Sequence, residues 1–216
     1  MIESYEQMPL RVYTQLLALR NQEDTDLQVM AILTGMTEDE LLHMPLTEYR
    51  KLRDRAGFIF YTPEAAPVKE SYKMGNWELI PTRPKAMITA QYIDFKEWAK
   101  ITDRDTTAEM LSALMVPAGR RYNIGYEITD VIEALQELPV TEAAGLRNFF
   151  TMRWAELMQS SLTYSAREAR KTMSREQRKE LQRMMRQVRL LLAGDGCAMW
   201  MRWQSLSAAR GPWSIA

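Results

Sequence analysis

Apolar residues recur every three to four positions along much of the chain, which is the spacing that places them on one face of an α-helix. The stripes near the N-terminus predict four helices, marked by Leu10, Tyr13, Leu16 and Leu17; by Leu27, Met30, Ala31 and Thr34; by Leu41 and Leu42; and by Tyr49, Leu52 and Ala56. Gly35 is expected to close the second helix, and Pro45 to end the third near Met44. Two stripes lie nearer the C-terminus, at Leu146, Phe149, Phe150, Trp154, Leu157 and Met158, and at Leu181, Met184, Met185, Val188, Leu191 and Leu192.

Helix starts are indicated by capping boxes, in which a short polar side chain and a Glu or Gln three residues later bond to each other's backbone N–H. Five matches occur, at Thr37 with Glu40, Thr106 with Glu109, Asp130 with Glu133, Ser165 with Glu168, and Ser174 with Gln177. Thr47 is expected to cap the helix that follows Pro45. Together with the stripes, these matches predict a mainly helical protein.

One short segment has a different pattern. In "SYKMGNWELIPTRP" (71–84), Gly75-Asn76 separates two short arms, which predicts a β-hairpin that Pro81 and Pro84 end. The preceding "TPEAAPVKE" (62–70) has the composition of a linker. The predicted fold is therefore mainly α: a bundle-like helical domain with a small hairpin near 71–80. We expect an N-terminal helical unit at 1–61, a linker at 62–70, and a mainly helical unit at 71–216 with basic helices at 165–193.

Composition narrows the class of protein. The chain has 216 residues and no apolar run that approaches the roughly 20 residues of a membrane span. Its N-terminal residues lack the order of a signal peptide, and Cys197 is the single cysteine, so a cytoplasmic location is expected.

The net charge is zero, yet charge is distributed unevenly. Residues 1–150 hold 16 basic and 23 acidic side chains, and residues 151–216 hold 12 basic and 5 acidic side chains. The two parts thus carry net charges of about −7 and +7, and they can attract each other or a charged partner.

Residues with catalytic or metal-binding potential are isolated from one another. His43 has no second histidine or nearby cysteine to complete a zinc site, and it is expected to be a surface or capping residue. Asp103 and Asp105 lack the glycine and closing glutamate of a calcium loop. The acidic run at 38–40 suits the first turn of a helix, where carboxylates complement the helix dipole. We therefore expect no enzyme activity, no metal and no cofactor.

The C-terminal part is expected to bind protein. Its basic residues between 167 and 189 could contact phosphate, but Glu168, Glu176 and Glu180 interrupt the positive face, so nucleic-acid binding is not favoured. The chain also has 16 methionines, a residue common on surfaces that accept variable apolar partners. The candidate partner-binding residues are Met184, Met185, Val188, Leu191, Trp200 and Trp203.

The stretch "LQVMAILTGMTEDELLHMPLTEYRKL" (27–52) resembles the tail assembly chaperones of long-tailed bacteriophages, and "ITAQYIDF" (88–95) and "NFFTMRW" (148–154) are similar to pieces of related phage proteins. The resemblance implies a non-enzymatic protein in the host cytoplasm that holds the helical tape measure protein and recruits tail tube subunits. A homo-oligomer is also possible. Two alternatives remain open: a structural virion component such as a head–tail connector, and a nucleic-acid-binding protein that uses the basic C-terminal helices.

Overall fold

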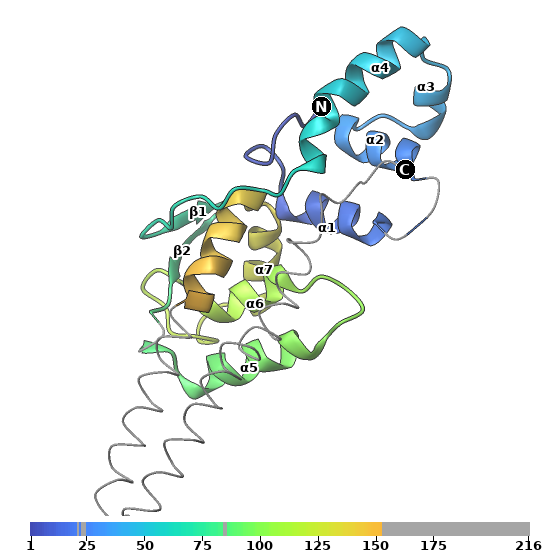
Figure 1. Cartoon of the computed structure of the whole chain (residues 1–216). Coiled ribbons are helices and arrows are strands. Elements are labelled where there is room, and N and C mark those ends of the chain that lie inside the picture. Colours follow the sequence, from blue (N-terminus) through green and yellow to red (C-terminus); the bar gives the residue numbers. More distant parts are fainter. Residues whose placement is uncertain (21, 23–24, 84–85, 153–216) are drawn as a thin grey trace, which may run out of the picture.

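The computed structural model describes residues 1–20, 22, 25–83 and 86–152. These residues form a mainly helical structure with a small antiparallel sheet, which confirms the predicted fold class. The helices α2 (Asp26–Thr34), α3 (Glu38–Leu42) and α4 (Leu46–Arg55) lie at one end of the described part, and α5 (Thr89–Lys100) lies at the other (Figure 1). The sheet, α6 (Thr107–Leu114) and α7 (Ile128–Gln136) lie between them.

The N-terminal helices follow the predicted pattern closely. They are α1 (Leu10–Leu19), α2 (Asp26–Thr34), α3 (Glu38–Leu42), α4 (Leu46–Arg55) and the 3-10 helix η1 (Ala56–Phe60). Gly35 ends α2 with a left-handed φ of 74°, a conformation that glycine adopts without a steric cost. Both bonds of the capping box between Thr37 and Glu40 are present at the start of α3.

Two predicted helix starts, at Thr47 and Asp130, are wrong, and the start at Thr106 is correct but lacks its capping bond. The helix after Pro45 begins at Leu46, with Pro45 as the flanking residue, so Thr47 lies inside the first turn. Thr106 flanks α6 (Thr107–Leu114) but forms no capping bond, and α7 (Ile128–Gln136) begins two residues before Asp130. The other two predicted capping boxes lie outside the described residues.

The predicted hairpin is present, and it belongs to a larger sheet. Strands β1 (Tyr72–Met74) and β2 (Trp77–Pro81) pair antiparallel across Gly75-Asn76, where Gly75 has a φ of 56°. A third strand, β3 (Met115–Pro117), pairs with the other edge of β2 and places Val116 opposite Ile80. Because β3 directly follows α6, the sheet is held against the helices through the chain itself.

Two hydrophobic clusters make up the core. The sheet-side cluster lies between the sheet, α6, α7 and the helix at 140–152, and includes Leu79, Leu111 and Leu135, all fully buried. All eight residues of α6 are buried, since α6 packs between α5 (Thr89–Lys100) and α7. The N-terminal cluster lies among α1, α2, α3 and η1 and contains buried residues such as Met8 and Leu33.

The two clusters are joined where the chain enters α1 and where it leaves α7. The Leu10 N–H donates to the Leu138 carbonyl at 2.8 Å, and the Val140 N–H donates to the Met8 carbonyl at 2.9 Å. Leu10 is buried in the sheet-side cluster, while Val140 is buried in the N-terminal cluster. Each segment therefore contributes a backbone bond and an apolar side chain to both halves of the core.

The segment predicted as a linker, 62–70, has no regular secondary structure, but it is bound along its length. The Ala66 N–H donates to the Thr141 carbonyl at 2.9 Å, and Lys69 pairs with Glu142 at 2.6 Å. A Cβ atom built on Gly145 would lie 2.0 Å from the Ala66 carbonyl oxygen. The segment thus crosses the helix at 140–152 so closely that only glycine fits at position 145.

Gly145→Ala is expected to destabilise the protein by about 1–3 kcal/mol, because the new methyl group overlaps backbone atoms that cannot rotate away. This cost exceeds the helix-propensity gain of about 1 kcal/mol that alanine brings. The control is Gly57→Ala, where nothing lies within 4 Å of the added Cβ. Urea denaturation measures both, and equal stability of the two variants would contradict the crossing described above.

Tyr5 joins the N-terminal segment to the end of η1. Its hydroxyl donates to the carbonyls of Ile59 (3.2 Å) and Tyr61 (2.9 Å), and its side chain is buried. Burial raises the pKa of Tyr5 well above its usual value, and the neighbouring Tyr13 raises it further. The folded state therefore favours the neutral phenol.

Stability should fall as the pH rises above about 10, because the unfolded chain then loses the Tyr5 proton while the folded chain retains it. Tyr5→Phe should make this fall shallower, at a cost of about 1 kcal/mol at neutral pH for the lost hydrogen bonds. Tyr61→Phe is the control, since the Tyr61 ring is exposed. Denaturation curves at several alkaline pH values give the free energy of unfolding at each pH. If this free energy falls with pH as steeply in Tyr5→Phe as in the wild type, the prediction is wrong.

Candidate protein-interaction surface

The residues predicted to bind a partner, from Met184 to Trp203, lie outside the described residues, as do Cys197 and the basic segment 165–193. Their proposed role stays a prediction. A candidate site must therefore be built from the described part of the chain, and three locations there carry polar or exposed apolar side chains of interest: the end of α3, the loop before α6, and the corner between α3 and α4.

His43 ends α3. Its backbone N–H donates to the Asp39 carbonyl at 3.1 Å, and its Nδ1 lies 2.8 Å from the same oxygen. The ring also lies 3.4 Å from an Asp39 carboxylate oxygen and is 78% exposed. These contacts agree with the predicted capping role of His43.

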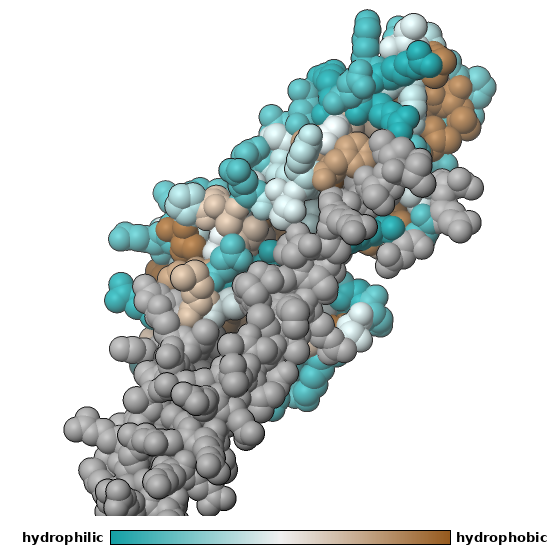
Figure 2. Space-filling model, viewed as in Figure 1, coloured by the Kyte–Doolittle hydropathy of each residue, from teal (hydrophilic) through white to brown (hydrophobic). Residues whose placement is uncertain are grey.

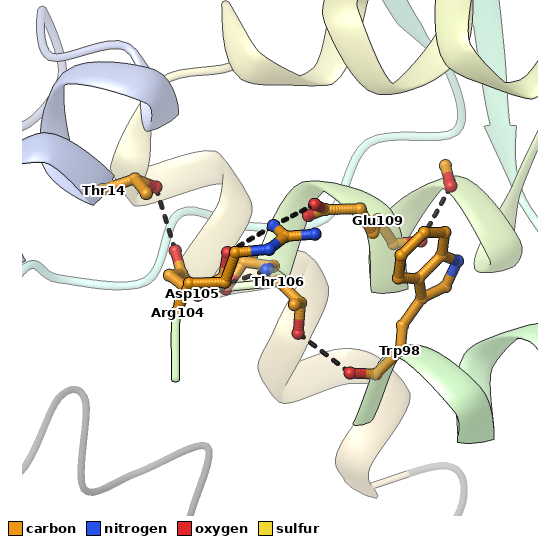
Figure 3. A network of polar contacts seen from close by, with 8 residues as sticks. Thr14, Trp98, Arg104, Asp105, Thr106 and Glu109 are labelled. Atoms are coloured by element: carbon orange, nitrogen blue, oxygen red, sulfur yellow. Dashed lines mark hydrogen bonds and ion pairs between the residues drawn. The ribbon is translucent and has the colours of Figure 1, made fainter. Parts of the chain in front are cut away.

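The loop before α6 holds a polar network that links α1 to α6 (Figure 3). Asp105 accepts a bond from Thr14 Oγ1 at 3.0 Å, and bonds from the N–H and Oγ1 of Thr107 at 3.2 and 2.7 Å. The side chain of Thr106, which was predicted to cap α6, instead donates to the Trp98 carbonyl at 3.2 Å. Asp105 thus performs the capping that the sequence pattern assigned to Thr106.

The half-buried Arg147 lies near this network. Burial lowers the pKa of Arg147, while the nearby Tyr13 and Asp105 favour its charged form. Arg104 forms an ion pair with Glu109, the residue predicted to complete the Thr106 capping box. Within the described ranges, no three Asp, Glu, His or Cys side chains are grouped so that they could hold a metal ion. The hydrogen bonds of Asp105 give it a structural role between α1 and α6.

The corner between α3 and α4, residues 38–55, is the most exposed apolar feature of the N-terminal helices. Leu42 is 65% exposed and Leu46 is 62% exposed, on either side of Pro45. Apolar surface is visible there over α3 and the start of α4, bordered by hydrophilic surface (Figure 2). Isolated exposed leucines are common in proteins, but here two lie on either side of one turn and concentrate exposed apolar area there.

The packing of α4 is unusually light. None of its residues is buried, and its contact with the N-terminal cluster comes from the half-buried Tyr49 and Leu52. Its C-terminal end is held by ion pairs from Arg53 to Asp26, at 3.9 Å, and from Arg55 to Glu3. Because these pairs are largely exposed, each contributes at most about 1 kcal/mol. The corner is therefore loosely attached to the N-terminal cluster, and the apolar side chains of Leu42 and Leu46 are available for contact with another molecule.

Charged residues lie on the same faces as the two leucines. Glu38 and Asp39 precede Leu42 by four and three positions on α3, and Arg50 follows Leu46 by four positions on α4. Residues at these spacings lie on one face of a helix. All three charged side chains are exposed. The corner thus presents an acidic end, an apolar centre and a basic end.

Other exposed apolar residues lie on the sheet side of the molecule, at Ile80, Ile88, Tyr92, Ile93 and Ile124. The loop that carries Ile124 is held to α5 by Tyr122, whose hydroxyl donates to Asp94 at 2.8 Å. None of these residues carries a sequence signal of its own. Leu42 belongs to a predicted helix stripe, and neither helical spacing nor hydropathy reveals that Leu42 faces solvent while Leu41 is buried.

Comparisons with family models, curated proteins and solved structures gave no match to this chain. Among the described residues, no helix combines the length and the apolar content that are needed to cross a membrane.

Asp105→Ala is expected to cost about 1–3 kcal/mol of stability, since Thr14 and Thr107 lose their acceptor and the half-buried Arg147 loses a compensating charge. The matched control is Asp103→Ala, because Asp103 is exposed and should change stability by less than about 0.5 kcal/mol. Chemical denaturation followed by circular dichroism distinguishes them. Equal losses would show that Asp105 has no special structural role.

Proposed function

We propose that this protein is a non-enzymatic assembly factor of a long-tailed bacteriophage, which binds helical segments of the tape measure protein and recruits tail tube subunits to it. The observation that carries the proposal is that the stretch with the strongest resemblance, 27–52, folds into α2, α3 and most of α4 and leaves Leu42 and Leu46 in solvent. In this proposal the protein acts in the host cytoplasm.

Helix binding suits the chemistry of the corner. An amphipathic helix binds by placing apolar residues, spaced three or four apart, against an apolar surface. Leu42 and Leu46 supply such a surface, and Glu38 and Arg50 lie on the same faces, where they can orient a partner with charged flanks. Charges around an apolar contact mainly set orientation and association rate.

The absence of catalysis is part of the same proposal. The conspicuous polar residues of the described part have structural partners: His43 contacts the end of α3, and Asp105 accepts bonds from Thr14 and Thr107. A group that is fully engaged in local structure is poorly placed to act on a substrate. This supports a binding role for the chain.

Co-expression with the tape measure protein of the same phage tests the proposal. The wild-type chain should keep the tape measure protein in the soluble fraction, and the two should co-purify. Leu42→Ser combined with Leu46→Ser should weaken binding at least about tenfold, because each leucine contributes roughly 1.5–3 kcal/mol when buried. Ile124→Ser is the control, since Ile124 is 60% exposed but lies on the sheet side.

Two results would contradict the proposal. One is a tape measure protein that is equally insoluble with and without this chain. The other is stoichiometric recovery of this chain from purified phage particles, which would favour a structural component of the virion. Loss of solubilisation in Ile124→Ser but not in the leucine variant would move the binding site away from the α3–α4 corner.

A further inference from the structure

The α3–α4 corner has charges of opposite sign on the two sides of its apolar centre. Along the chain, the exposed residues of the corner run from Glu38 and Asp39 on α3, through Leu42 and Leu46 on either side of Pro45, to Arg50 on α4. Asp39 is close to His43, but no ion pair involves Glu38 or Arg50 among the residues that the structure describes. Two unmatched charges of opposite sign therefore flank a pair of exposed leucines.

Such an arrangement is complementary to itself. In a two-fold symmetric dimer the same patch of each copy forms the interface, so that if one residue contacts a second across it, the second contacts the first. When two corners meet in this way, the leucines of both copies can cover one another at the axis. The acidic end of each α3 then approaches the basic end of the other α4.

We propose that the α3–α4 corner pairs with the same corner of a second copy of this chain, with Leu42 and Leu46 at the centre and Glu38 facing Arg50 across the interface. A second copy fits better than an arbitrary partner, because it necessarily brings the opposite charge to each end of the patch. Burial of this face also gives α4 the apolar packing that its own core does not supply.

The dimer is expected to be weak. Stable interfaces bury about 1,200–2,000 Å² in total, and two short helices from each copy supply less than this. A dissociation constant on the order of 10–100 μM corresponds to such a small contact. The charged ends make it sensitive to salt, because exposed ion pairs are screened at high ionic strength.

This inference does not depend on the proposed function. If both hold, the dimer covers the leucines until a helical partner displaces the second copy, and binding and dimerisation then compete. If co-expression with the tape measure protein fails, the dimer can still be measured in the purified chain. The two proposals can therefore fail separately.

Sedimentation equilibrium of the full chain over a range of concentrations tests the apolar centre. The wild-type chain should show a monomer–dimer equilibrium, and Leu42→Ser or Leu46→Ser should raise the dissociation constant at least about tenfold. Ile124→Ser should leave it unchanged. A monomer at every concentration, or dimers of equal strength in the leucine variants, would overturn the proposal.

A charge exchange tests the orientation. Glu38→Lys alone, or Arg50→Glu alone, places like charges opposite each other and should weaken the dimer several-fold. The double variant Glu38→Lys/Arg50→Glu restores opposite charges across the interface and should recover the wild-type constant to within about threefold at low salt. Circular dichroism confirms that each variant is folded. A double variant as weak as the single ones would rule out the proposed pairing.

Discussion

Two backbone hydrogen bonds, between residues 8–10 and residues 138–140, connect the two halves of the core. Leu10 bonds to Leu138 and Val140 bonds to Met8, so the entrance to α1 and the exit of α7 are fixed to each other. Because prolines occupy positions 9 and 139, where they form an isolated bridge, both segments are also restricted in backbone conformation. The position of α1, and with it the whole N-terminal cluster, depends on this crossing.

The other inter-segment contacts reinforce the same crossing. Segment 62–70 contacts the helix at 140–152 at Gly145, and Thr14 of α1 donates to Asp105 in the loop before α6. Gln91, which is 2% exposed, donates to the Ala113 carbonyl and to Thr82, and so binds α5 to the end of α6 and to the chain beyond β2. The buried Gln91 side chain therefore satisfies its hydrogen bonds by joining separate elements of the fold.

Against this well-connected core, the α3–α4 corner is peripheral. Leu41 is buried and anchors α3, whereas Leu42 and Leu46 face solvent, and α4 is held by half-buried side chains and exposed ion pairs. A lightly packed element costs little to rearrange, which is common in regions that bind partners. Both proposals made for this protein concern the corner because it combines exposed apolar area with separated charges.

The sequence by itself determined the local features of the fold. Helix α2 ends at Gly35 and α3 begins with the Thr37–Glu40 box, because each signal depends on residues within four positions of one another. The hairpin turn at Gly75-Asn76 is equally local. Tertiary structure decided the rest: the pairing of β3 with β2, the bond from Thr14 of α1 to Asp105, and the exposure of Leu42 next to the buried Leu41. These features arise from contacts between residues that are far apart in the chain, and periodicity along the sequence contains no information about which segments meet.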